Sequence, residues 1–398
     1  MTTSSPSAGR GAGLAQPIIA GLLAAIVGYA STFTLALASL GAVGATPAQA
    51  GSGLFAICTA VGVLNIVIAW RTRLPMSFAW STPGIAFLLT VGAPPEGFGA
   101  VAGAFLVTAL LIVIAGVFKP FARAVAAIPG PIANAMLAGI LLTLCLAPVN
   151  AVAEMPVLAL PIVAAWALGL VFARRYAVPL AVLVALIIIL TVAELPATGT
   201  LTQPLATPVM PIFTFDAIVR IALPLFVITM ASQNLPGIAV MRANGYPIDP
   251  APHFVATGVA SGATALLGGQ TVNLAAITAA ITAGPEAHPD PARRWVGPVT
   301  AGATYIAFGL TAGLAATLIA AAPPLLIQAV AGLALLSSLA SAMGNALERE
   351  PDRLPAILTF VTTASGITIL GIGAAFWGLI AGIGMHLVLK AAARRSAQ

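Results

Sequence analysis

The stretch from Pro75 to Gly92 lies among long apolar runs but lacks the pattern of a membrane-spanning helix. Pro75 and Pro83 each lack a backbone N–H donor and disfavour helix at the preceding residue, so the chain between them is predicted to run extended. After Pro83 a helix of about ten residues covers about 15 Å, half of a bilayer core. Such a broken segment is tolerated in a membrane only inside protein or beside a cavity, and it indicates a transporter binding site.

The composition places the chain in a membrane. Of its 398 residues, 60% are hydrophobic and 7% are charged, whereas a soluble domain carries about 25% charged residues. We therefore predict an all-α polytopic membrane protein with the lipid bilayer as a partner. The net charge of +6 comes from basic residues scattered near the ends of apolar runs, which indicates orientation in the membrane and no nucleic-acid partner. No metal cluster or nucleophile–base pair stands out, so we expect no cofactor, no metal and no enzyme activity.

Prolines, glycines and charges divide the chain into fourteen predicted membrane elements. Their predicted bounds are 15–40, 50–70, 75–92, 97–118, 131–148, 156–173, 177–194, 217–241, 252–267, 270–284, 296–320, 323–346, 354–371 and 373–391. If the N-terminus is cytoplasmic and the elements alternate in direction, fifteen of the 16 basic residues are cytoplasmic and only Arg220 is outside. This agreement with the positive-inside rule predicts fourteen crossings with both termini in the cytoplasm.

Fourteen elements split into seven plus seven at a loop rich in Pro and Thr. An odd number of elements in each half gives the second half the opposite orientation, which is an inverted repeat. Residues 129–139 resemble residues 323–332, which supports the repeat. The predicted parts are a disordered cytoplasmic tail at 1–14, a first repeat at 15–194, an extracytoplasmic linker at 195–215, a second repeat at 216–392 and a cytoplasmic tail at 393–398.

A second broken element opens at Gly268-Gly269-Gln270-Thr271-Val272-Asn273 and ends at Gly284. Paired glycines weaken a helix, and Gln, Thr and Asn can serve an exposed helix terminus. Two half-helices would then meet near the bilayer midplane with their N-termini facing each other. Each N-terminus presents unsatisfied N–H groups and about half a positive charge, which favours a carboxylate or another anion. The alternative is a short re-entrant helix with a structural role.

Polar side chains in the eighth element form the cluster Ser232-Gln233-Asn234, followed by Pro236. Buried amides in lipid are costly unless paired, so they indicate either substrate contacts or hydrogen bonds between helices. Amide N–H donors suit a carboxylate ligand. Trp80 is predicted either to stack on an aromatic ligand or to pack in the protein interior.

Residues that could couple transport to a proton are harder to identify from the sequence. No Asp or Glu lies in the middle of a predicted span, and Glu348 and Glu350 form an interfacial group with neighbouring arginines. His386 is the titratable side chain that falls well inside a span, and its pKa range suits proton transfer. It is the proton-coupling candidate, with a structural role as the alternative.

Three motifs carry a resemblance to a known family. These are Trp80-Ser81-Thr82-Pro83-Gly84 after Pro75-Met76-Ser77, the run from Ser232 to Met241, and Gly268 to Asn273. Together they resemble the BenE family of benzoate transporters, over nearly the whole chain. The resemblance implies proton-coupled benzoate uptake across the bacterial inner membrane. It also implies kinship with the uracil/xanthine and sulfate transporters.

That fold has fourteen segments in core and gate domains, with the third and tenth segments built as short strands followed by half-helices. The substrate lies between these two segments, beside the eighth. Nucleobase relatives carry a glutamate near the position of Gln233 and another in the tenth segment, whereas both places are neutral here. The difference argues against a nucleobase and fits a carboxylate.

The sequence therefore predicts a secondary transporter that imports benzoate or a similar small aromatic carboxylate with a proton. Another anion or a nucleobase on the same fold, and a passive anion channel, remain alternatives. The oligomeric state stays open, a homodimer included. The predicted substrate-binding residues are Trp80, Ser81, Thr82, Gln233, Asn234, Gln270, Thr271 and Asn273, and the proton-coupling candidate is His386.

Overall fold

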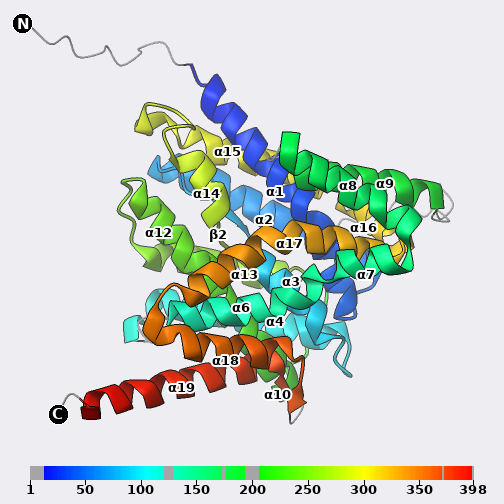
Figure 1. The fold of residues 1–398 in the computed structure, drawn as a ribbon. Coiled ribbons are helices and arrows are strands. Elements are labelled where there is room, and N and C mark those ends of the chain that lie inside the picture. The colour runs from blue at the N-terminus through cyan, green and yellow to red at the C-terminus, as the bar shows by residue number, and fades with distance from the viewer. Residues whose placement is uncertain (1–12, 121–128, 173–175, 193–205, 370–371, 397–398) are drawn as a thin grey trace, which may run out of the picture.

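The computed structural model describes residues 13–120, 129–172, 176–192, 206–369 and 372–396. Most of these residues are helical (Figure 1). Much of the predicted N-terminal tail and of the predicted linker, and the last two residues, lie outside the described ranges. The elements of the first half are α1 (Ala15–Ala42), α2 (Pro47–Thr72), β1 (Phe78–Trp80), α3 (Thr82–Val91), α4 (Phe98–Val117), α6 (Gly130–Cys145), α7 (Ala147–Glu154), α8 (Pro156–Phe172) and α9 (Ala177–Val192).

The second half is also mostly helical, and like the first half it contains a short strand followed by a short helix, β2 and α14. Its elements are α10 (Phe215–Ala217), η3 (Ile218–Ala222), α11 (Leu223–Thr229), η4 (Met230–Asn234), α12 (Leu235–Ala243), α13 (Pro250–Ala265), β2 (Val272–Leu274), α14 (Ala276–Ala283), η5 (Pro291–Arg293), α15 (Val296–Gly309), α16 (Ala312–Ala321), α17 (Pro324–Leu347), η6 (Glu350–Asp352), α18 (Arg353–Ala364), β3 (Thr368–Ile369), β4 (Ile372–Gly373) and α19 (Ala374–Ser396). The short β3–β4 ribbon has no counterpart among the sequence predictions.

Seven helices in the described ranges are long and apolar enough to cross a membrane. They are α1, α2, α4, the continuous run from α6 to α7, the run from Phe215 to Arg242, α17 and α19. An eighth is added if α15 and α16, which meet at 55°, count as one bent span. Three more helices, α3, α8 and α9, are apolar but shorter. The chain is thus a mostly helical, multi-pass membrane protein.

The helices gather into two groups. In one, α2 packs against α15, α4 against α13, and α1 against α15, with β1, β2 and α14 among them. In the other, α6 packs against α17 and α18, α18 against α19, and α8 against α9. Figure 1 shows α18 and α19 along one edge of the molecule and α14 and α15 toward the opposite edge. The main buried apolar cluster extends through both groups.

The eighth predicted element is one long helix with two π-helical turns, η3 and η4. Pro224 and Pro236 each stand two residues after the end of a π-turn. Proline removes a backbone donor and crowds the preceding turn, which explains why the helix widens at these two places. The turns present Arg220 in η3 and the polar cluster from Ser232 to Asn234 in η4.

The two halves repeat several local features. Helices α6 and α17 both follow an N-cap proline in nearly the same conformation, Pro129 with ψ 126° and Pro323 with ψ 122°. The interval in sequence from Pro129 to Pro323 equals that from Phe78 to Val272, which are the first residues of β1 and β2. The segment before each of α3 and α14 is therefore matched in position as well as in type.

Candidate functional site

Strands β1 and β2 form an antiparallel ribbon in the interior. Phe78 pairs with Leu274, Ala79 with Asn273, and Trp80 with Val272. Because the strands are antiparallel, α3 and α14 leave from opposite ends of the ribbon, each with its N-terminus at the ribbon. The N-cap residues Ser81 and Ala275 lie four residues apart along the ribbon, a rise of about 13 Å. The pairing thus brings two helix N-termini, from distant parts of the sequence, to the same region.

Side chains from neighbouring helices hold the outer edges of this ribbon. Asn65 of α2 donates to the Phe78 carbonyl at 2.9 Å and accepts from its N–H at 3.0 Å. Ser261 of α13 accepts from the Val272 N–H at 2.9 Å and donates to its carbonyl at 3.2 Å. The first residue of each strand is therefore satisfied by the helix that precedes it. A buried two-stranded ribbon needs such partners, because its edge groups cannot reach water.

The two helix N-termini differ in their capping. Ser81 Oγ, fully buried, accepts from the Gly84 N–H at 3.0 Å and caps α3. This bond leaves the hydroxyl proton of Ser81 available as a donor. Ala275 stands at the same place before α14 and gives no side-chain cap. The first N–H groups of α14 are thus without a side-chain acceptor, which is the arrangement that binds an anion.

Buried amides lie just before β2, at Gln270, and within β2, at Asn273. Gln270 is 1% exposed, and neither its Oε1 nor its Nε2 has a hydrogen-bond partner among the described residues. Asn273 is fully buried; its Nδ2 donates to the Leu274 carbonyl at 2.8 Å, while its Oδ1 has no partner in the same ranges. Buried polar atoms without partners cost about 1–3 kcal/mol each. Their presence here indicates that a ligand or water completes the site.

The remaining predicted polar residues differ in whether hydrogen bonds to the protein already occupy their polar side-chain atoms. Thr82 and Gln233 are half-buried, and the Gln233 amide makes no hydrogen bond to the described part of the chain. Asn234 is fully buried, and its Oδ1 accepts from the Leu274 N–H at 2.9 Å. Thr271 Oγ1 lies 3.3 Å from Thr229 Oγ1. Asn234 and Thr271 therefore use their polar atoms to fix β2 against the eighth element.

Trp80 packs in an aromatic cluster. Its Nε1 donates to Thr32 Oγ1 at 3.0 Å, and the side chain is 3% exposed. Its ring centroid lies 5.5 Å from that of Tyr305 and 6.2 Å from that of Tyr29, both edge to face. These contacts hold the Trp80 ring between α1 and α15.

His386 lies on α19, the helix along the opposite edge of the molecule from α14 (Figure 1). Its Nδ1 is 2.9 Å from Asp352 Oδ1, and Arg349 Nε is 3.7 Å from Asp352 Oδ2. Asp352 is 4% exposed. Sequence reasoning missed this partner because Asp352 was placed outside the predicted spans, and a helical pattern does not reveal a contact between η6 and α19.

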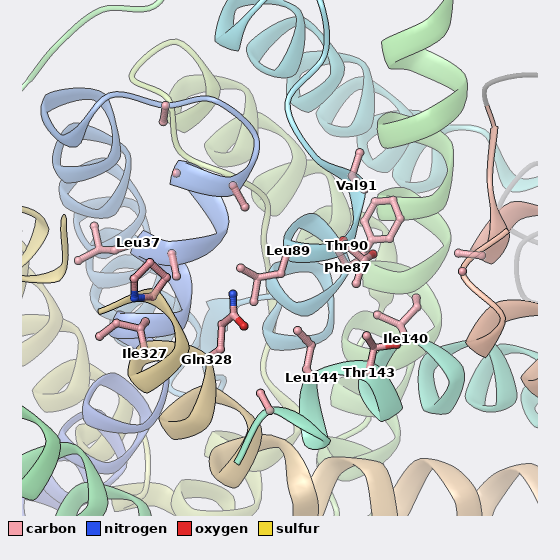
Figure 2. Close-up of a pocket in the computed structure, with 18 of the residues that line it drawn as sticks. Leu37, Phe87, Leu89, Thr90, Val91, Ile140, Thr143, Leu144, Ile327 and Gln328 are labelled. Carbon is pink, nitrogen blue, oxygen red and sulfur yellow. Dashed lines mark hydrogen bonds between the residues drawn. The ribbon is translucent and has the colours of Figure 1, made fainter. Parts of the chain in front are cut away.

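A cavity of about 760 Å³ separates the two helix groups. Its walls come from α1, the C-terminal half of α3, α6, α17 and α19. Figure 2 shows the Gln328 amide directed between Leu37 and Leu89, with Thr143 and Leu144 opposite. None of the predicted site residues lines it. Arg220 is the one charged residue among the described residues that line the cavity. The available signal for it was that, of the 16 basic residues, it alone was predicted to be on the outer side of the membrane.

Comparison with known proteins decides the family. The family model described as Benzoate membrane transport protein (BenE) matches residues 14–388. The chain belongs to this benzoate transport family. The BenE resemblance predicted from the three motifs is confirmed. The Inner membrane protein YdcO of Escherichia coli (strain K12) is 40% identical over 380 residues, covering 95% of this chain and 97% of that protein. The Benzoate membrane transport protein of Acinetobacter baylyi (strain ATCC 33305 / BD413 / ADP1) is 29% identical over 373 residues, covering 93% and 94%.

Solved structures show the same fold as this BenE family member. The transmembrane domain of the cyanobacterial bicarbonate transporter BicA superposes with a TM-score of 0.64 at 16% identity, covering 93% of this chain and 97% of that one. The structure of SLC26A9 gives a TM-score of 0.63 at 11% identity, covering 94% and 64%. The family is one of membrane transport proteins, so the protein is a membrane transporter and not an enzyme.

Proposed function

We propose that this BenE family protein imports benzoate, or a similar small aromatic carboxylate, together with a proton across the bacterial inner membrane. The observation that carries the proposal is the β1–β2 ribbon, from which α3 and α14 start, together with the unpartnered amide of Gln270 and the Asn273 amide, whose Nδ2 has one bond and a second N–H to donate. Two helix N-termini and amide donors supply the partial positive charge and the N–H groups that a carboxylate requires.

In this proposal the carboxylate binds between the two N-termini. The Ser81 hydroxyl, Thr82, and the amides of Gln233, Gln270 and Asn273 donate to its oxygens. Asn234 and Thr271 act as positioning residues, because their polar atoms are bound to protein. The aromatic ring of the ligand lies on the side of the ribbon where Trp80 and its aromatic neighbours form an apolar wall.

We propose further that the fourteen predicted elements form a seven-plus-seven inverted repeat with core and gate domains. Three features support it: the antiparallel ribbon, the equal intervals that separate Phe78 from Val272 and Pro129 from Pro323, and the matched edge bonds from Asn65 and Ser261. The group around the ribbon would be the core, and the group of α6, α17, α18 and α19 the gate. Both termini would be cytoplasmic, as the basic residues predict.

For the coupled proton, His386 remains the candidate, with Asp352 as its partner. A histidine and a buried carboxylate at 2.9 Å can share a proton that moves when the local environment changes. Cotransport of one proton with a monoanion is electroneutral, so uptake would not work against an inside-negative potential. This energetic benefit favours symport.

The test is uptake of radiolabelled benzoate by purified protein in proteoliposomes with an imposed pH gradient, in competition with uracil and sulfate. We expect accumulation that benzoate analogues inhibit and that an uncoupler abolishes. Accumulation insensitive to the uncoupler would exclude proton symport, and equilibration without accumulation would indicate a passive channel. Preferential inhibition by uracil or sulfate would assign a different substrate.

A charge reversal tests the binding site itself. Gln233→Glu would place a carboxylate near the ligand carboxylate and is expected to raise KM by at least about tenfold through like-charge repulsion. Gln49→Glu is the matched control, because it adds the same charge while glutamate still serves the capping box at the start of α2. Equal KM values for the two variants would refute the role given to Gln233.

A further inference from the structure

The cavity between the two helix groups has a composition that the ribbon site does not explain. Its walls are mainly aliphatic and aromatic side chains such as Leu37, Phe87 and Ile140, and they include the Gln328 amide and one guanidinium, that of Arg220. We propose that this cavity is an outer reception site for the aromatic carboxylate, with Arg220 as its charged anchor. The inference rests on the proposed function and adds a second place where the same substrate class binds.

The guanidinium of Arg220 has more N–H donors than its one contact in the described ranges uses. Its Nη1 lies 3.2 Å from Asp216 Oδ2, one turn earlier, and no other polar contact of Arg220 is present in the described ranges. A guanidinium carries five N–H donors in a fixed fork, so this single contact leaves a face that can hold a carboxylate. The side chain is 27% exposed, so the guanidinium is reachable yet partly shielded from solvent.

Local backbone geometry explains why Arg220 can reach the cavity. It lies in the π-turn η3, whose wider backbone is followed by Pro224, another residue of the cavity wall. π-turns are rare and occur frequently at functional sites, since they change the direction of side chains on a helix. The other π-turn of the same helix carries Gln233, so both widened turns present polar side chains toward proposed ligand positions.

The size and chemistry of the cavity fit an aromatic monocarboxylate. Its volume of about 760 Å³ is within the range of about 300–1,000 Å³ for small-molecule pockets. The apolar walls suit the ring, the guanidinium suits the carboxylate, and Gln328, directed into the space in Figure 2, adds an amide donor. An inorganic anion would leave the apolar walls without contacts.

The position of the cavity places it on the route to the ribbon. Phe87 lies five residues along α3 from Thr82, a distance of about 8 Å along the helix axis. The cavity therefore lies beyond the middle of α3, on the side where the helix ends at Val91 and where the charge distribution predicts the outside. A ligand held there would be between the external solution and the N-terminus of α3.

The experiment measures initial rates of benzoate uptake by whole cells that express the full chain, over a range of external concentrations and at low and high salt. The variants are Arg220→Gln, Arg220→Lys and Asp216→Asn. Lys390→Gln is the control, because it removes the same charge from an exposed position away from the cavity. Protein amounts in the membrane are matched for each variant.

We expect Arg220→Gln to raise KM about tenfold with Vmax within about twofold, and to reduce the salt dependence of KM. Arg220→Lys should recover part of the affinity, and Asp216→Asn should lower KM because it frees the guanidinium from its competitor. If the ion pair between Arg220 and Asp216 only stabilises the helix, Arg220→Gln and Asp216→Asn should change uptake in the same direction. That result would overturn the inference. An unchanged KM in Arg220→Gln would do the same while leaving the proposed function intact; no uptake by the wild type would overturn both.

Discussion

Asn65 gives the sharpest test of how the central ribbon is held. The side chain is 1% exposed and makes two bonds to Phe78, at 2.9 and 3.0 Å, in the place where a third strand would be. Asn65→Leu keeps the approximate volume but leaves the Phe78 N–H and carbonyl buried without those partners. At about 1–3 kcal/mol for each orphaned group, the free energy of unfolding should fall by about 2–6 kcal/mol. Uptake should also fall, because β1 positions the start of α3.

The assay measures unfolding of the purified protein in detergent solution. Unfolding is induced in one experiment by heating and in another by titration with a denaturing detergent. Asn134→Leu is the matched control, since the Asn134 amide donates only to the Gly130 carbonyl of its own helix at 2.8 Å. That variant should unfold close to the wild type. If both variants lose the same stability, or neither loses any, the reasoning about the ribbon edge is refuted.

Three further predictions concern the proposed binding and coupling residues. Gln270→Leu should stabilise the substrate-free protein by about 1–3 kcal/mol, because it removes a buried amide without partners, while the rise in melting temperature caused by benzoate disappears; a destabilised variant would contradict this. Ser81→Ala should cost about 1 kcal/mol as a lost N-cap and also weaken substrate affinity, whereas Thr46→Ala, which removes the N-cap of α2, should cost a similar amount with affinity unchanged. His386→Gln, which can still donate to Asp352, should abolish accumulation driven by a pH gradient but preserve benzoate counterflow; accumulation that persists would assign the proton to another group.

Local sequence chemistry explains several parts of the fold. Pro75 and Pro83 account for an extended segment ahead of a short helix, and Gly284 for the end of α14. Proline also explains both π-turns once the structure is known, but Pro224 and Pro236 alone do not show that the helix widens instead of breaking. The 55° bend between α15 and α16 falls in a run predicted to be one span, 296–320. No proline or charged residue lies at the break between Gly309 and Ala312, so the signals used to divide the chain do not predict it.

The site was harder to predict than the fold. Residue types identified Gln270 and Asn273 as polar groups beside a half-helix, and their unpartnered atoms fit that interpretation. The same reasoning could not separate Asn234 from Gln233, because only the register of β2 determines that Asn234 is used by the Leu274 N–H. The contact between His386 and Asp352 likewise joins elements whose relation depends on helix packing.

The edge bonds of the ribbon have a consequence for how transport would proceed. Asn65, Ser261 and Asn234 tie both strands to α2, α13 and the eighth element, so the strands cannot shift without breaking contacts to three helices. If the proposed core moves against the proposed gate, the ribbon must therefore move together with these three helices, relative to α6 and α17 on the other side of the cavity. A disulfide engineered from α2 to β1 should be harmless to turnover, whereas one that joins α3 to α6 across the cavity should arrest it.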